Sequence, residues 1–167
     1  GRKVRYYLDK NKFSIKIKAL VMDFDGVLTD NRVIINSDGT ESVICSRDDG
    51  YAIEKIRELG IHTLILSKEK NNIVLSRAKK LKTDIIRGEE DKLAALKYWC
   101  KSKKLEPEEV ALIGNDTPDL EALKFVTYSF CPADSFSKVK ETVKYVLKTK
   151  GGHGCIREIY ENYIKSE

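Results

Sequence analysis

Carboxylate, amide, hydroxyl and ammonium side chains stand at the ends of several short apolar runs. Asp23-Phe24-Asp25-Gly26 follows ALVM, Ser67 follows TLIL, and the polar run 114–119 (GNDTPD) follows VALI. Lys92 stands at the start of a predicted helix. Two carboxylates two residues apart converge on one centre only if the chain turns, which Gly26 permits. Acidic groups from two loops commonly hold a hard cation, so the pattern indicates a magnesium site.

These side chains meet only if the apolar runs before them are neighbouring strands. From Ile17 onward, short apolar runs alternate with longer helical patterns, which is typical of a parallel sheet with crossover helices. Ligands of such sheets bind outside the carboxyl ends of the strands. We therefore expect an α/β fold with a Rossmann-like parallel sheet. The predicted strands are Ala19–Met22, Thr63–Leu66, Ile85–Ile86, Val110–Ile113 and Val126–Phe130.

Apolar residues at helical spacing predict the helices between these strands. Each stripe is interpreted as core packing. One helix is expected to extend from Phe136 to Leu147, with lysines on its outer face, and another to cover residues 156–164. The two earlier stripes are Ile53, Ile56 and Leu59, and Leu93, Leu96 and Cys100.

A projecting β-hairpin is predicted directly after the first strand. Arg32–Asn36 and Ser42–Ser46 favour β structure and are joined through Asp38 and Gly39, a pair that favours a hairpin turn in which both central residues have positive φ. One small hairpin cannot bury its own apolar residues. Those residues are Val33, Ile35, Val43 and Cys45.

The composition fits one folded domain. The 167 residues include 41% hydrophobic residues, enough to build a core, and 31 Lys+Arg against 26 Asp+Glu give a net charge of +5. Positive and negative charges alternate along the helices, so we expect no nucleic-acid partner. The alternative, a basic nucleic-acid-binding protein, is supported only by the net positive charge. No apolar run approaches the length of a membrane span and no leader sequence is evident, so we expect a cytoplasmic protein without a membrane partner.

The domain is expected to occupy residues 17–167, with residues 1–16 as a linker or N-terminal arm. The chain starts at Gly1 without a Met, which suggests a piece of a longer protein. The four cysteines are far apart and form no C-x-x-C pair, so neither a zinc site nor a disulfide framework is expected. Reduced, buried thiols are the simplest interpretation of these cysteines.

The polar motifs together resemble those of a known enzyme family. Residues 23–30 (DFDGVLTD) resemble the first motif of the haloacid dehalogenase phosphatase superfamily, and Ser67, Lys92 and 114–119 match its other three motifs in order and spacing. The hairpin and the segment 151–154 (GGHG) extend the resemblance to a capless branch. That branch contains 3-deoxy-octulosonate 8-phosphate phosphatases, nonulosonate 9-phosphate phosphatases and the C-terminal domain of acylneuraminate cytidylyltransferases.

The resemblance implies phosphoryl transfer through a covalent intermediate. Asp23 would be the nucleophile, and Asp25 would be the general acid and then the general base. Ser67 and Lys92 would bind the transferring oxygens. Magnesium would lie between Asp23, Asp25 and the loop 114–116, with Asp119 in support. Thr29 is expected to contribute to substrate binding.

Two departures from the family pattern bear on activity and substrate. Asn115 stands where the family commonly has a metal-binding Asp, so weaker magnesium binding is expected, with Asp116 as a compensating ligand. At the position of Glu69, octulosonate phosphatases usually have Arg, whereas nonulosonate phosphatases also have Glu. We interpret Glu69 and Lys80 as a pair that faces the sugar; the alternative is that both are solvated surface charges.

These observations predict a magnesium-dependent phosphomonoesterase. The expected substrate is an acylneuraminate or nonulosonate 9-phosphate, with the chain as the C-terminal domain of an acylneuraminate cytidylyltransferase. The alternatives are a 3-deoxy-octulosonate 8-phosphate phosphatase and a catalytically weak oligomerisation domain. Without a cap the site is open and must be covered by something else. In the branch that the chain resembles, hairpins of this kind pack together in a tetramer, so the resemblance implies a homotetramer with the hairpin at the interface. The segment 151–154 or the C-terminal helix is expected to reach the neighbouring site, although His153 is equally compatible with a plain turn.

Overall fold

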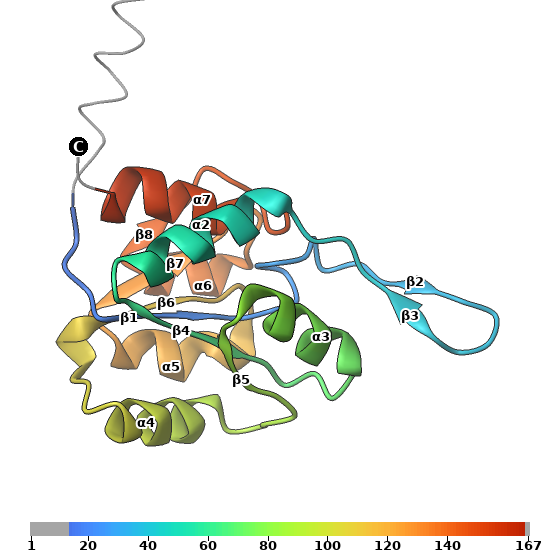
Figure 1. The fold of residues 1–167 in the computed structure, drawn as a ribbon, viewed down its shortest axis with the longest axis horizontal. Coiled ribbons are helices and arrows are strands. Elements are labelled where there is room, and N and C mark those ends of the chain that lie inside the picture. Colours follow the sequence, from blue (N-terminus) through green and yellow to red (C-terminus); the bar gives the residue numbers. More distant parts are fainter. Residues whose placement is uncertain (1–13, 166–167) are drawn as a thin grey trace, which may run out of the picture.

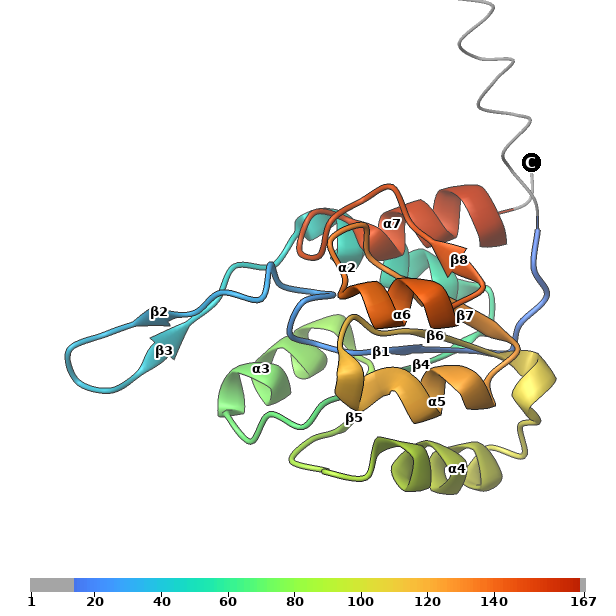
Figure 2. The same cartoon turned by 180° about the vertical axis from the view of Figure 1, so that it is seen from behind.

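The computed structural model describes residues 14–165 as a parallel sheet with helices on both faces (Figures 1 and 2). Six strands lie in the order β5-β4-β1-β6-β7-β8, and every neighbouring pair is parallel. This arrangement confirms the expected α/β fold. The strands are β1 (Ala19–Met22), β4 (His62–Leu66), β5 (Asp84–Ile86), β6 (Val110–Ile113), β7 (Tyr128–Cys131) and β8 (Tyr145–Val146).

The two central strands are buried on both faces because their side chains alternate between two cores. Leu20 and Met22 of β1 belong to one apolar cluster, and Ala19 and Val21 belong to the other. The helices α2 (Arg47–Glu58), α3 (Asn72–Leu81) and α7 (Cys155–Ile159) cover the first face. The helices α4 (Lys92–Ser102), α5 (Leu120–Phe125) and α6 (Ser137–Thr142) cover the second face.

The helix predicted from Phe136 to Leu147 is wrong in its second half. The helix α6 ends at Thr142, and Tyr145 and Val146 form the edge strand β8. Backbone pairing with β7 outweighs the helical stripe here, and the ring of Tyr145 packs 4.9 Å from that of Phe130 between centroids. Two residues of the predicted apolar face are consequently exposed, Phe136 and Val146.

Smaller differences concern the ends of elements. Strand β7 starts two residues after the predicted Val126, because Val126 caps the C-terminus of α5. Leu59 caps α2 and is exposed instead of packing in the core. The predicted C-terminal helix is present as α7, followed by a π-helical turn, η3 (Tyr160–Ile164).

The hairpin projects from the body of the molecule, as predicted, but only two residues of each strand pair (Figure 1). Its strands are β2 (Ile34–Ile35) and β3 (Glu41–Ser42). The turn differs from the expected type, because only Gly39 has a positive φ, +87°. Asn36 accepts a hydrogen bond from the Gly39 N–H and donates its own N–H to the carbonyl of Thr40, which is the pattern of a three-residue loop.

The apolar residues of the hairpin divide differently from the expectation. Val43 and Cys45 are partly buried and pack against the core. The exposed fraction is 73% for Ile35 and 67% for Ile44, and Val33 and Ile34 are about half exposed. Most of the apolar surface of the hairpin therefore has no covering within the described part of the chain.

The N-terminal boundary of the domain lies earlier than residue 17. Ile15 is buried in the core, and its N–H donates a 2.7 Å hydrogen bond to the carbonyl of Tyr163. The rest of the predicted arm, residues 1–13, lies outside the described residues. All four cysteines are free thiols. No helix between residues 14 and 165 has both the length and the apolar character needed to cross a membrane.

Candidate active site

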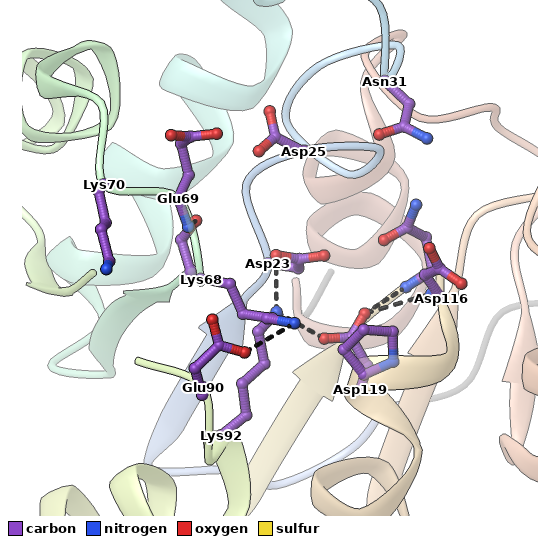
Figure 3. A pocket seen from close by; sticks show the side chains of 13 residues that line it. Asp23, Asp25, Asn31, Lys68, Glu69, Lys70, Glu90, Lys92, Asp116 and Asp119 are labelled. Carbon is purple, nitrogen blue, oxygen red and sulfur yellow. Dashed lines mark hydrogen bonds and ion pairs between the residues drawn. The ribbon is translucent and has the colours of Figure 1, made fainter. Parts of the chain in front are cut away.

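The predicted polar segments meet at the carboxyl edge of the sheet, around a cavity of about 390 Å³ (Figure 3). The edge is formed by the neighbouring strands β4, β1 and β6, so loops that are far apart in sequence become adjacent. Most of the predicted site residues line this cavity: Asp23, Asp25, Ser67, Glu69, Lys92, Asn115, Asp116 and Asp119.

A buried ammonium group lies between two carboxylates at the floor of the cavity. Lys92 Nζ donates hydrogen bonds to Asp23 Oδ1 at 2.9 Å and to Asp119 Oδ1 at 2.7 Å (Figure 3). Helix α4 begins at Lys92 because the Asp91 side chain accepts a hydrogen bond from the Ala94 N–H and caps it. The first residue of a helix is thereby fixed beneath Asp23.

Burial and charge oppose each other in this cluster. Burial, and next the carboxylate of Asp119, raise the pKa of Asp23 to about 8, while Lys92 acts in the opposite direction. Burial alone would lower the pKa of Lys92, but Asp23 and Asp119 outweigh it and raise that pKa. The lysine is therefore a permanent cation at the cavity floor, and a second positive charge near Asp23 would favour its carboxylate form.

The loop after β1 turns sharply so that Asp25 returns toward the cavity. Gly26 has a φ of +84°, and a Cβ there would collide with the amide of Asn115. The Thr29 hydroxyl oxygen accepts hydrogen bonds from the N–H groups of Gly26 (3.2 Å) and Asn31 (3.1 Å). Thr29 is buried and does not line the cavity, so its predicted contact with substrate is not seen; its side chain holds the loop.

Asp25 is half-buried and lies above Asp23 in Figure 3, on the same side of the cavity as Glu69. Burial raises the pKa of the Asp25 carboxyl, and the negative charges of Glu69 and Glu41 raise it further, against Lys92. A carboxyl with a raised pKa beside an open cavity is suited to general acid and base chemistry.

Ser67 and Glu69 enter the site from the loop between β4 and α3. The buried Ser67 hydroxyl accepts a 3.0 Å hydrogen bond from the Glu69 N–H, which leaves its own proton available to a ligand in the cavity. Two lysines that sequence reasoning did not single out, Lys68 and Lys70, flank Glu69 and also line the cavity. Lys68 pairs with Glu90 at 3.0 Å.

Lys80 does not join this group. It lies near the C-terminal end of α3, where it lines a different cavity together with residues of α2. The expected pairing with Glu69 is therefore wrong, because Glu69 precedes the N-terminus of the same helix.

The carboxylate of Asp23, the backbone carbonyl of Asp25 and the side-chain amide of Asn115 converge at one point. The end of the Asn115 amide that faces them lies 2.8 Å from Asp23 Oδ2 and 3.1 Å from the backbone oxygen of Asp25. An amide can present its NH₂ group, which donates to both oxygens, or its oxygen, which completes a set of three oxygen ligands. One carboxylate, one backbone carbonyl and one amide are a donor set that fits magnesium.

Asp116 is engaged differently from the expectation. Its carboxylate accepts a 2.6 Å hydrogen bond from the Thr117 N–H and so caps the short helix η2 (Thr117–Asp119). Asp119 accepts the N–H groups of Asn115 at 3.0 Å and Asp116 at 3.2 Å, which fixes the loop beneath the cavity. Within residues 14–165, no three acidic, His or Cys side chains form a metal cluster. A cation bound at this position would accordingly depend on Asn115.

The segment 151–154 packs on the catalytic loop of its own chain. The Gly152 N–H donates a 2.9 Å hydrogen bond to the carbonyl of Val27, and a Cβ at Gly151 would collide with the carbonyl oxygen of Gly26. Asp134 accepts the Gly151 N–H at 3.0 Å. The glycines therefore clamp the loop that carries Asp25, a role that sequence reasoning did not assign. Reach into a neighbouring site stays a prediction.

Comparison with known proteins agrees with this geometry. The family model for haloacid dehalogenase-like hydrolases matches residues 5–159. A 3-deoxy-D-manno-octulosonate 8-phosphate phosphatase from Yersinia pestis is 31% identical over 144 residues, which are 86% of this chain and 77% of that protein.

Solved structures show the same relationship. A 3-deoxy-D-manno-octulosonate 8-phosphate phosphatase from Moraxella catarrhalis, in complex with magnesium, phosphate and KDO, superimposes with a TM-score of 0.85 at 32% identity and covers 94% of this chain and 89% of its own. A hydrolase of the same family from Streptomyces avermitilis reaches 0.85 at 42% identity, covering 86% and 83%. The chain therefore belongs to the haloacid dehalogenase-like hydrolases, on the capless phosphatase branch of that family.

Proposed function

We propose that this chain hydrolyses the phosphate monoester of a sugar acid, with Asp23 as the nucleophile. The observation that carries the proposal is the pairing of Asp23 with Lys92 beside the three converging oxygens at the carboxyl edge of the sheet. Lys92 contacts Asp23 and also lines the cavity, so it can orient both the nucleophile and a phosphate group bound there.

In the first step, an Asp23 oxygen attacks phosphorus and the bond from phosphorus to the sugar oxygen breaks. Asp25 gives its proton to that oxygen, so the sugar acid leaves as an alcohol. The products at this stage are an aspartyl phosphate and the Asp25 carboxylate.

In the second step, Asp25 takes a proton from a water molecule, whose oxygen attacks phosphorus and releases inorganic phosphate from Asp23. In both steps the hydroxyl group of Ser67 donates a hydrogen bond to a phosphate oxygen, and the positive charge of Lys92 stabilises the phosphate group. Asp23, the backbone oxygen of Asp25 and Asn115 would hold magnesium, which would supply a positive charge that offsets repulsion between the carboxylate and the phosphate.

A sugar acid fits the charges around the cavity opening. Lys68 and Lys70 line the cavity on either side of Glu69 in the sequence (Figure 3). Either lysine can bind the carboxylate of the substrate, and Glu69 can accept hydrogen bonds from sugar hydroxyls. The named relatives act on an eight-carbon sugar acid. The sequence Ser67-Lys68-Glu69 favours a nine-carbon acid, an acylneuraminate or nonulosonate 9-phosphate, for this chain.

The exposed hairpin, and two residues of the cavity, support a place for this chain in a larger assembly. The exposed residues Val33, Ile34, Ile35 and Ile44 favour a homotetramer in which hairpins pack together. Membership of an acylneuraminate cytidylyltransferase as its C-terminal domain fits Asn115, because the domains of that kind tend to carry Asn at this position. It also fits Glu69, which nonulosonate phosphatases share. Asn115 also favours a second candidate function, a catalytically weak domain that organises that synthetase.

The test is phosphate release from matched substrates. With magnesium, we expect the 9-phosphate of a nonulosonate to be hydrolysed faster than 3-deoxy-octulosonate 8-phosphate, and both faster than p-nitrophenyl phosphate. Removal of magnesium by EDTA should stop all three reactions. Preference for the eight-carbon substrate would overturn the nine-carbon assignment, and no release from any of them would favour the organising role.

A further inference from the structure

A second cavity, of about 600 Å³, lies between α2 and α3 and shares no lining residue with the catalytic cavity. Figure 1 shows these two helices on the same side of the sheet. Five cations line this cleft: Arg47 and Arg57 from α2, Arg77 and Lys80 from α3, and Lys82 from the C-cap of α3. A single carboxylate, Glu54, faces them.

Between residues 14 and 165, none of the five cations forms an ion pair. The charge of Arg77 is nevertheless felt by Asp49: burial raises the pKa of that carboxyl, and Arg77 acts in the opposite direction. Neighbouring surface lysines do pair, as Lys55 does with Glu58 at 3.4 Å. Like charges gathered in one concave site repel each other and raise the local concentration of anions. The cleft is therefore short of negative charge.

One cation of the cleft, Arg77, and the ring of Tyr51 are held by contacts within the protein. Arg77 Nη2 donates a 3.3 Å hydrogen bond to the carbonyl of Ser46, which fixes its guanidinium group. The ring of Tyr51 is covered by the guanidinium carbon of Arg157, 4.1 Å from the ring centroid. Gly50 brings the helices close, because a Cβ there would lie 3.4 Å from Leu81 Cδ2. Preorganised cations lose less entropy on binding.

We propose that this cleft binds a small organic phosphate that carries two or more negative charges. Arginine guanidinium groups bind phosphate oxygens in pairs, and lysines add point charges. The volume lies within the range of small-molecule sites, and the concave shape favours a compact ligand over an extended acidic peptide. Glu54 can accept hydrogen bonds from hydroxyl groups of the ligand. This site is independent of the phosphatase activity.

The test is calorimetric titration of the protein with pyrophosphate and with ADP, in EDTA so that the catalytic cavity lacks magnesium. Both probes should bind, more weakly as salt rises. Lys80→Glu and Arg57→Glu change exposed residues of the cleft, and each should weaken both affinities about tenfold or more. Lys79→Glu is the matched control, because Lys79 is exposed on the same helix but does not line the cleft; it should change affinity less than about twofold.

Three results would overturn the proposal. The first is no binding of either probe at millimolar concentration. The second is binding that Lys80→Glu and Arg57→Glu leave unchanged, which would place the probes elsewhere, or that Lys79→Glu weakens equally, which would reflect net charge alone. The third is tighter binding of a polyglutamate peptide than of ADP, which would identify the cleft as a protein-docking surface.

Discussion

The carboxyl edge of the sheet, around Asp23 and Lys92, differs from the hairpin in whether its side chains are satisfied by contacts within the chain. At the edge, buried polar groups satisfy one another within one chain: Lys92 is held by Asp23 and Asp119, and the loop backbone is held by Asp119 and Thr29. On the hairpin, Ile35 and Ile44 are largely exposed. Burying unpaired polar groups is costly, so the edge must be complete in each chain, whereas exposed apolar surface is tolerated until a partner covers it.

The largest effect is expected at the edge, for Asp23→Asn. An amide cannot form the acyl phosphate, so phosphate release should fall about a thousandfold or more. The measurement is release of phosphate from the preferred sugar-acid phosphate under saturating magnesium. Circular dichroism should show an unchanged fold, and turnover near the wild-type rate would mean that another group is the nucleophile.

The next effect concerns the hairpin. Ile35→Asp combined with Ile44→Asp adds two charges to surface that we expect to be buried between copies, so the assembly should dissociate. Light scattering at micromolar concentration should report a tetramer for the wild type and smaller species for the variant. Ser37→Asp, in the exposed turn, is the matched control and should keep the assembly. A monomeric wild type with full activity would contradict the interface.

A smaller change should sharpen the metal site. Asn115→Asp places a second carboxylate beside Asp23, so the magnesium concentration for half-maximal activity should fall severalfold. Asn72→Asp, an exposed residue of α3 outside the catalytic cavity, should leave that concentration unchanged. If both variants behave like the wild type, position 115 does not contribute to magnesium binding.

The smallest effect is a shift of the pH profile in Glu69→Gln. The negative charge of Glu69 raises the pKa of Asp25, so its removal lowers that pKa. Because Asp25 must be protonated to act as the acid, the alkaline limb of activity should move to lower pH, by less than about one pH unit. Glu90→Gln is the control: Glu90 is the ion-pair partner of Lys68, and its change should leave the alkaline limb of activity in place. A shift to higher pH would exclude this role of Glu69.

The sequence was most informative where local pattern and burial agree. The buried runs of β1 and β6, and the polar residues that follow them, were predicted with their positions because a strand and the loop after it are adjacent in sequence. Lys92 was found only as part of the motif set. Its partner Asp119 lies on another loop, and only the fold brings them to 2.7 Å.

The errors have a common physical origin in contacts between distant segments. Tyr145 and Val146 fit a helical stripe as well as a strand, and pairing with β7 decides between them. Lys80 lies nearly the full length of α3 away from Glu69. The prediction paired the two residues by their opposite charges and did not take this distance into account. The four apolar residues predicted to be unburied by the hairpin alone divide in the structure, because Val43 and Cys45 pack against the core.

The contact of Gly151 and Gly152 with the loop at Gly26 and Val27 joins an early segment of the chain to one of the last segments of the fold. The nucleophile is among the first residues of the domain to leave the ribosome, but the clamp on its loop arrives only with a segment that follows the last strand of the sheet. At synthesis rates of about 5–20 residues per second, the growing chain carries an unclamped catalytic loop for several seconds. The packing that holds the loop around Asp25 is thus complete only after the segment 151–154 has been synthesised.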